Sequence, residues 1–476
     1  PQVGALLQRA DPSPRTMIVF DIGTKGLTGM TKNRKRWGRR GLAVAAVVAT
    51  GAMLAPSANA AETAGPAGSW RDPVWSLDLA AHPLRSTEPG RNTADLRALG
   101  AMIGGAKVVG LGEATHGSHE FFAMKERVFR YLVEEKGFRA FALEASWSAG
   151  MEIDDYVQTG RGDAREILKR TVAGSPWDRE EFVSLIRWMR DYNRAHPART
   201  VHFVGDDLGG PSINDAFFAR ITDYVKQHHP AALPRLNELY TGIRPIDDHL
   251  AYLRKPLDER KRLATKAEQA LELIKGLPGV DDLDWTFQHA RFVAQTARFL
   301  SVDLSDPKSL PGFQILRDQA MAQNVAWWQR RTGHKVLLSA HNTHVAYIPD
   351  NPEMYPKTQG AFLRETLGRD YLPVGFSFDQ GSFLSKDIAI GGDWKRFSVP
   401  AAPPGSNEHT LDKVRFEDFY LDFRTAPPAA RAWLDTARPT RTIGTLFPVD
   451  PVAISLGRSY DVVIHLHDVR QADLGR

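Results

Sequence analysis

The sequence contains no cysteine among its 476 residues. This absence excludes a thiol nucleophile, a cysteine-ligated zinc site and any disulfide. The fold must therefore be stabilised by its hydrophobic core alone, which a chain of this length can supply. The composition, 42% apolar and 25% charged, is ordinary for a globular protein, either one large domain with an insertion or two domains.

The chain also lacks an apolar segment near its N-terminus that is long enough to form a transmembrane helix easily. The apolar stretch 42–55 is too short to cross a bilayer easily. It follows the basic run RKRWGRR in a segment that starts at Met30, and the small residues PSANA come next, before Ala61. This order predicts a secretory signal peptide over residues 30–60, with a retained signal anchor as the alternative. Residues 1–29 fit no targeting pattern, and we interpret them as upstream sequence or a mis-set start.

Net charge is small once this leader is set aside. The whole chain carries a formal charge of +5, but residues 1–60 hold nine Lys or Arg and only two Asp or Glu. Of the 61 basic and 56 acidic residues, 52 and 54 remain, a net charge of −2. We therefore expect a secreted protein with no nucleic-acid partner and, after signal cleavage, no membrane partner.

Strand and helix patterns alternate along residues 73–470, where we expect one domain. This alternation predicts an α/β fold, with a mostly parallel central sheet flanked by helices. Residues 213–300 are helical in pattern and highly charged, which favours a helical insertion or lid; plain helical packing on the core is the alternative. The predicted strands are 106–112, 138–144, 200–207, 334–341, 371–378 and 459–469, and the clearest helices are 118–136, 178–197 and 313–333.

After each of four predicted strands, the ionisable side chains are histidine or carboxylate. Ligands of parallel sheets bind at the carboxyl ends of the strands, so these side chains should meet in one crevice. Buried charge is costly unless it is paired or used, so the pattern predicts a site, although the two aspartates could instead cap the next segment. The residues are Glu113 and His116, Glu144, Asp206 and Asp207, and His341 and His344.

The chemistry open to such a site is limited. No G-x-S-x-G occurs, and the nearest sequence, SWSAG, lacks the first glycine, which disfavours a serine hydrolase. The remaining readings are a water activated by histidine, with a carboxylate fixing the tautomer, or a water activated by a metal. The E-x-x-H and H-x-x-H spacings differ from the helical zinc motif, so we expect no obligate cofactor, with a divalent metal as the alternative. His465 and His467 alternate in the last predicted strand and are interpreted as wall residues.

Four segments together resemble the erythromycin esterase family. They are GEATHGSHEFFAMK, the ALEA that contains Glu144, RDQAMAQN and AHNTHV, in matching order and spacing over roughly residues 73–470. The resemblance implies a hydrolase that opens a cyclic ester without a covalent intermediate. It implies that His116 is the general base, that Glu113 and Glu144 orient the water and the base, and that His341 and His344 serve the leaving group or the substrate.

The resemblance also marks one departure. Family members that hydrolyse macrolides carry arginine where this chain has Lys125, which can still polarise a carbonyl but lacks the planar fork. We expect Lys125, His344 and Asp207 to bind the substrate, a small-molecule ester that is either a macrolide or another bulky ester. Two other functions remain open: a metal-dependent hydrolase of phosphoester or amide bonds, and a non-enzymatic haem- or iron-binding protein of related fold.

Overall fold

The structure is a computed structural model that describes residues 72–210, 213–279 and 282–474. The predicted upstream segment 1–29 and signal peptide 30–60 lie outside the described residues. Within the described part, no helix is both long enough and apolar enough to cross a membrane.

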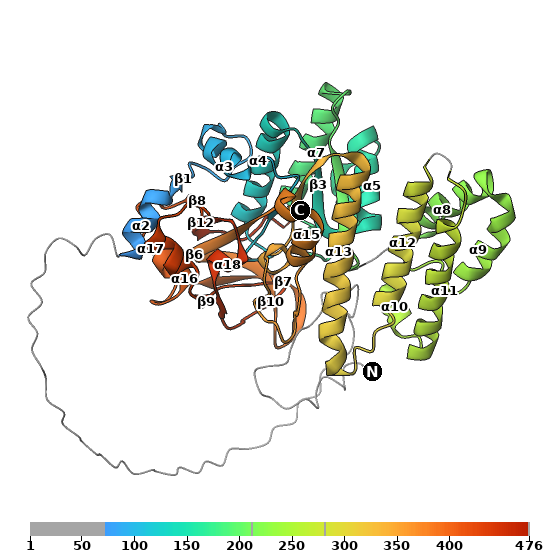
Figure 1. Cartoon of the computed structure of the whole chain (residues 1–476). Coiled ribbons are helices and arrows are strands. Elements are labelled where there is room, and N and C mark those ends of the chain that lie inside the picture. The colour runs from blue at the N-terminus through green and yellow to red at the C-terminus, as the bar shows by residue number, and fades with distance from the viewer. Residues whose placement is uncertain (1–71, 211–212, 280–281, 475–476) are drawn as a thin grey trace, which may run out of the picture.

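A ten-stranded sheet forms the centre of the molecule (Figure 1). The six strands from β12 to β4 in its spatial order run parallel, and β8 and β1 add antiparallel pairs at one edge. This mostly parallel sheet confirms the predicted fold class. In spatial order the strands are β1 (His82–Pro83), β8 (Phe419–Asp422), β12 (Val462–Val469), β6 (Tyr371–Asp387), β2 (Val108–Leu111), β5 (Lys335–Ser339), β3 (Phe138–Ser146) and β4 (His202–Asp207).

The strand β6 runs well beyond the predicted 371–378. Its polar second half pairs antiparallel with β7 (Gly391–Val399) and parallel with β10 (Leu446–Phe447). A separate two-stranded sheet joins β9 (Arg438–Thr440) to β11 (Val452–Ile454).

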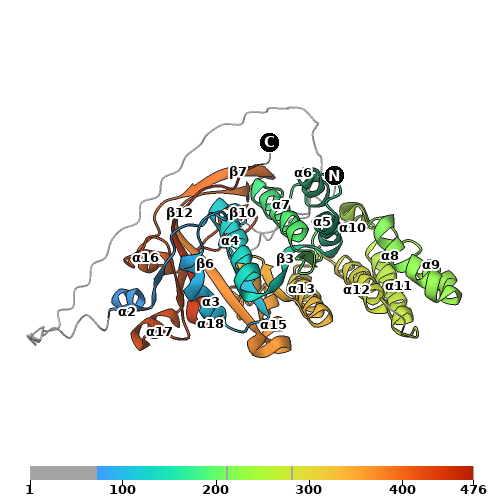
Figure 2. The same ribbon diagram turned by 90° about the horizontal axis from the view of Figure 1, so that it is seen from above.

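The parallel strands are buried on both faces, because successive apolar residues along them belong to two different cores. Val108 packs with one core and Val109 with the other, as do Leu338 and Leu337 on the neighbouring strand. Helices therefore cover both faces (Figure 2), as parallel sheets require. The first face carries α3 (Arg97–Ile103), α4 (His119–Lys136), α5 (Trp147–Thr159), α6 (Ala164–Thr171) and α7 (Glu180–Ala195). The second carries α2 (Pro73–Ala80), α13 (Leu310–Thr332), α14 (Asn342–Val345), α15 (Gln359–Leu367), α16 (Asn407–Leu411), α17 (Pro428–Leu434) and α18 (Leu456–Ser459).

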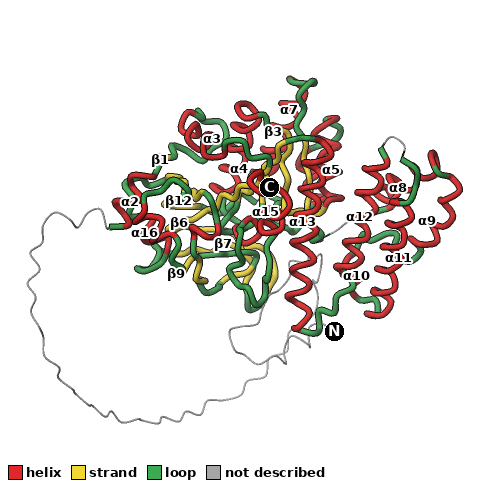
Figure 3. The backbone as a smooth tube through the Cα atoms, in the orientation of Figure 1, coloured by secondary structure: helices red, strands yellow, loops and turns green. Residues whose placement is uncertain are grey.

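Residues 213–279 and 282–300 are helices and loops, and they lie beyond α5 and α13 at one side of the sheet (Figures 1 and 3). Their apolar residues, such as Phe217 and Phe292, join the core of the second face. The helices are α8 (Asp215–His228), α9 (Leu233–Tyr240), α10 (His249–Leu253), α11 (Leu257–Lys275) and α12 (Leu283–Phe299). Short 3₁₀ turns occur at Ala94–Leu96, Pro230–Ala232, Pro307–Ser309 and Gly368–Asp370.

The chain leaves β2 and β5, which are neighbours, towards opposite faces of the sheet. After β2 it enters α4 on the first face, and after β5 it enters α14 and α15 on the second. Such a divergence opens a crevice at the carboxyl ends of the two strands, which is where parallel sheets bind ligands.

The β2–α4 loop, residues 112–118, is held at this crevice by distant parts of the chain. The Gly112 N–H donates to the Val374 carbonyl at 2.8 Å. The Gly117 carbonyl accepts the N–H groups of Leu384 at 2.9 Å and Ala472 at 2.8 Å. A Cβ at Gly117 would lie 2.0 Å from the Leu384 carbonyl oxygen, so only glycine allows this approach. The loop is therefore fixed by segments that are hundreds of residues away in the sequence.

Candidate active site

His116 and Glu113 form a buried dyad in the β2–α4 loop. Glu113 Oε1 lies 2.6 Å from His116 Nδ1, so the proton on that nitrogen is donated to the carboxylate. The other ring nitrogen, Nε2, is then the basic atom of the neutral imidazole. His116 lines the crevice, with the Trp177 ring edge-on to it at a centroid distance of 5.3 Å.

Lys125 lies behind this dyad. Its ammonium is an ion-pair partner of Glu113 Oε2 and donates to the Ala340 carbonyl at 3.3 Å. Burial lowers the pKa of Lys125, against the opposing effect of the Glu113 charge. The sequence predicted that Lys125 contacts the substrate. In the structure Lys125 is 1% exposed and does not border the cavity, so that prediction is corrected to a contact with Glu113. The face of α4 that carries Phe121 and Val128 also carries Lys125, and this face packs against the sheet.

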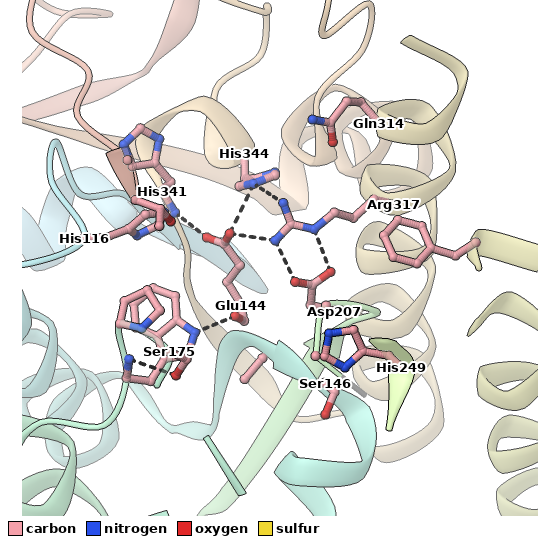
Figure 4. A pocket seen from close by; sticks show the side chains of 18 of the residues that line it. His116, Glu144, Ser146, Ser175, Asp207, His249, Gln314, Arg317, His341 and His344 are labelled. Carbon is pink, nitrogen blue, oxygen red and sulfur yellow. Dashed lines mark hydrogen bonds and ion pairs between the residues drawn. The ribbon is translucent and has the colours of Figure 1, made fainter. Parts of the chain in front are cut away.

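Glu144 is the centre of a second group of contacts (Figure 4). Its Oε1 accepts from Arg317 Nη2 at 2.9 Å and lies 3.2 Å from His344 Nε2. Its Oε2 accepts the backbone N–H of His341 at 2.9 Å. Burial opposes the charge on Glu144, but His344 and Arg317 outweigh it and hold the pKa of this carboxyl well below its usual range.

Arg317, from α13, joins Glu144 to Asp207. Its Nε and Nη2 donate to the two oxygens of Asp207 at 2.9 and 2.6 Å, a fork-to-fork geometry. Figure 4 shows the guanidinium between the two carboxylates. It already supplies the positive charge that these carboxylates need, so the position between them is filled by a protein side chain.

The two histidines of the AHNTHV segment carry different charges. Asp318 Oδ1 lies 2.9 Å from His344 Nδ1, and Asp318 and Glu144 together raise the pKa of His344 well above its usual value despite burial. His344 is therefore an imidazolium. Burial and the neighbouring His116 lower the pKa of His341 well below its usual value, so His341 is neutral.

The neutral His341 has a free ring nitrogen beside the dyad. Its Nδ1 lies 3.3 Å from the Thr343 backbone N–H and 3.2 Å from Thr343 Oγ1. In the tautomer in which Nδ1 accepts the backbone N–H, the single proton is on Nε2. That nitrogen has no hydrogen-bond partner among the described residues. The His341 ring lies 4.8 Å, centroid to centroid, from the His116 ring. A basic nitrogen and an N–H donor therefore stand side by side.

The two aspartates at the end of β4 differ in environment. Asp207 borders the cavity and is paired with Arg317. Asp206 faces away from it, accepts from Gln359 Nε2 at 2.6 Å, and is completely buried. Burial and the adjacent Asp207 charge raise the pKa of Asp206 well above its usual value.

A cavity of about 950 Å³ lies over these residues. The structure brings His116, Glu144, Asp207, His341 and His344 to its wall, whereas Glu113 and Lys125 lie behind the wall. One side of the cavity is apolar, and the helical segment contributes to it through α10. These apolar residues are Leu250, Leu253, Phe299, Leu300, Leu304 and Phe313. A cavity of this size and lining accommodates a bulky, largely apolar ligand.

Three residues of the site could not be given a role from the sequence pattern: Arg317, Asp318 and Trp177. Arg317 and Asp318 begin the RDQAMAQN segment, so the family resemblance pointed at them without giving their function. A charged pair inside the helix pattern 313–333 reads as solvent-facing, yet Asp318 is completely buried. Trp177 does not follow a predicted strand, so the strand-end pattern could not identify it as a site residue.

Comparison with known proteins identifies relatives. The family model for erythromycin esterase matches residues 133–469. Erythromycin esterase type II of Escherichia coli is 23% identical over 375 residues, covering 72% of this chain and 87% of the relative.

Two solved structures share the fold. A succinoglycan biosynthesis protein is 30% identical with a TM-score of 0.75, covering 87% of this chain and 100% of that one. An erythromycin esterase mutant in its open conformation is 19% identical with a TM-score of 0.64, covering 80% of this chain and 96% of that one.

Proposed function

The chain belongs to the erythromycin esterase family, and on that premise we propose that it is an exported hydrolase that opens a cyclic or other bulky ester with a water molecule activated by His116. The observation that carries the proposal is the His116–Glu113 dyad at the cavity wall, with the unpaired Nε2–H of His341 beside it. The family itself supports ester hydrolysis; the substrate and the mechanism are our inference.

In this mechanism His116 Nε2 takes a proton from water while Glu113 holds the Nδ1 proton and stabilises the imidazolium that forms. Lys125 is the ion-pair partner of Glu113 behind the dyad. The hydroxide attacks the ester carbonyl carbon, and the proton then passes from His116 to the departing alkoxide. No covalent bond to the protein is needed.

His341 is suited to bind the carbonyl oxygen. A neutral N–H donor stabilises the negative charge that develops on that oxygen. The Nε2–H of His341 is buried and unpaired, so binding of the carbonyl requires that this atom be uncovered. Glu144 supports this role, because its carboxylate holds the backbone of His341 in place. Arg317 and His344 in turn keep Glu144 ionised.

The cavity favours a large substrate. Its volume of about 950 Å³ and the apolar side formed by residues such as Leu253 and Phe313 suit a macrolactone or an ester of comparable bulk. Export rests on the charge and hydropathy pattern of residues 30–60.

A panel of esters and lactones tests the proposal. The full chain is expressed, and hydrolysis of macrolides, smaller lactones and aryl esters is followed by mass spectrometry in the presence of H₂¹⁸O. We expect one label in the carboxylate product and none in the protein. Failure to hydrolyse any member of the panel, or an acyl adduct on the protein in its intact mass during turnover, would overturn the proposal. A haem absorption band in an inactive protein would favour the binding function instead.

A further inference from the structure

A second cluster of histidine and carboxylate residues lies outside the cavity. β12 presents His465 and His467, which are two residues apart and so face the same side of the sheet. On the adjacent strand β6, Ser377 pairs with His465, and Asp379 lies beside His467. Asp412, just past α16, covers both histidines. None of these residues borders the cavity.

The nitrogen and oxygen atoms of this cluster converge. Asp412 Oδ1 lies 2.8 Å from His467 Nδ1 and 3.4 Å from His465 Nε2. One carboxylate oxygen of Asp379, one of Asp412 and one nitrogen of His467 all lie within 4.8 Å of one another. His465 is outside this group of three and meets it at Asp412. Ligand atoms of a tetrahedral zinc ion are about 3.4 Å apart, so small side-chain movements bring these atoms into coordination distance.

The partners of these groups fix their orientation. His465 Nδ1 contacts Ser377 Oγ at 3.1 Å, which leaves Nε2 directed at Asp412. Asp379 Oδ1 accepts the backbone N–H of Ala402 at 3.0 Å. Metal-binding histidines and carboxylates are held in this way by hydrogen bonds on the side away from the ion. His465 is completely buried and Asp379 is 3% exposed, so both are pre-positioned.

The cluster carries excess negative charge and is open to solvent on one side. Asp418 adds a third carboxylate to those of Asp379 and Asp412. Its Oδ1 accepts the backbone N–H of His467 at 3.0 Å. The nearby Arg441 bonds to the Asp379 backbone carbonyl and to the Pro400 carbonyl. The His467 side chain is 40% exposed and that of Asp412 is 23% exposed, which gives an ion a path from solvent.

We propose that His465, His467, Asp379 and Asp412 bind one divalent ion of the zinc class and so fasten α16 to strands β6 and β12. Two imidazole nitrogens with two carboxylate oxygens form a ligand set that suits Zn²⁺, Co²⁺ or Ni²⁺ better than Mg²⁺ or Ca²⁺. The site is structural: it is separate from the residues proposed to hydrolyse the ester.

The test is binding of Zn²⁺ alone to the full chain after exhaustive chelation, by titration calorimetry, with Co²⁺ absorption as a report on coordination. We expect one saturable ion per chain at this cluster and a higher melting temperature in its presence. His467→Gln and Asp412→Asn should each weaken binding about 10–100-fold and abolish the thermal shift. Asp379→Asn gives a further variant should either of these fail to fold.

Three controls locate the ion. His228→Gln and Asp393→Asn change exposed residues of the same types and should leave binding unchanged. Glu144→Gln should also retain the ion, because Glu144 borders the cavity and is not part of this cluster. Absence of saturable binding, unchanged binding in both His467→Gln and Asp412→Asn, or loss of binding in Glu144→Gln instead would each overturn the proposal. In the first case the cluster is a hydrogen-bonded histidine pair only.

Discussion

The carboxylate of Glu144 accepts the backbone N–H of His341 at 2.9 Å, so a side chain of β3 fixes the N-cap residue of α14. The same carboxylate receives the charges of His344 and Arg317. These contacts leave Glu144 as an organiser of the groups around it, while the dyad of His116 and Glu113 remains free to act on water.

Replacing His116 by alanine should remove hydrolysis and leave stability nearly unchanged. The ring serves chemistry at the cavity wall, and general-base assistance is typically worth about 10²–10⁴-fold. The measurement is kcat on the best substrate of the ester panel, together with a thermal melt. A variant that retains more than about a tenth of the wild-type rate would mean that another residue is the base.

Lys125→Met should lower kcat and leave KM nearly unchanged, because Lys125 touches Glu113 and does not border the cavity. Without the ammonium, Glu113 loses the cation that holds its second carboxylate oxygen, and the orientation of the dyad is no longer fixed from behind. We expect the loss in kcat to fall within the 10²–10⁴-fold range of general-base assistance, at about its lower end. Lys125→Arg keeps the charge and should restore most of the rate. A change confined to KM would place Lys125 against the substrate after all.

Arg317→Met should destabilise the protein. Removing the guanidinium leaves Asp207 buried without its cation and leaves Glu144 with His344 alone, and breaking a buried ion pair costs about 3–5 kcal/mol. Urea denaturation measures the loss. Arg331→Met, at an exposed position of the same helix, is the matched control and should change the free energy of unfolding by no more than about 0.5 kcal/mol. Equal effects of the two substitutions would show that the Arg317 network is energetically neutral.

His119 should make stability depend on pH in the alkaline range. It lies between Glu181, 2.7 Å from Nδ1, and Glu88, 2.9 Å from Nε2. Burial lowers its pKa, but these two carboxylates outweigh burial and raise the pKa of His119 to about 9 from the ordinary 6.5. Between those values the folded state holds a proton that the unfolded state releases, so stability falls as pH rises from 6.5 through about 9.

Chemical denaturation across pH 6 to about 10 measures this dependence. His119→Gln should flatten the curve, and His228→Gln, at an exposed position, should not. A wild-type curve with no decline over this range would mean that His119 is neutral in the folded protein.

Much of the fold could be predicted from the sequence, because the signals are local. The alternation of short apolar runs with amphipathic helices specifies a parallel sheet, and the predicted helix 118–136 matches α4, which ends where Gly137 adopts a left-handed φ of 73°. The second half of β6 was missed: its polar residues resemble a loop, and only pairing with β7 and β10 makes them a strand.

The site was predictable only where residues follow strands. Strand ends specify a shared edge, so Glu113, Glu144 and His341 could be grouped without knowing the structure. The directions in which helical side chains point could not be predicted from the sequence. Arg317 reaches Glu144 from 173 positions away, and Lys125 points at Glu113, because of how α13 and α4 are rotated against the sheet.

The anchoring of the β2–α4 loop bears on how the protein matures. Gly117 is bonded to Ala472, and the next residues bond to the same distal segment, with His119 N–H donating to the Arg470 carbonyl at 2.9 Å. Contacts of such high sequence separation form only when both segments are present and the long loop between them has closed. A nascent chain still on the ribosome has no segment 470–472 available to position His116. Activity should therefore arise only after this segment has been released and docked, so the chain cannot act on an ester before its synthesis is complete.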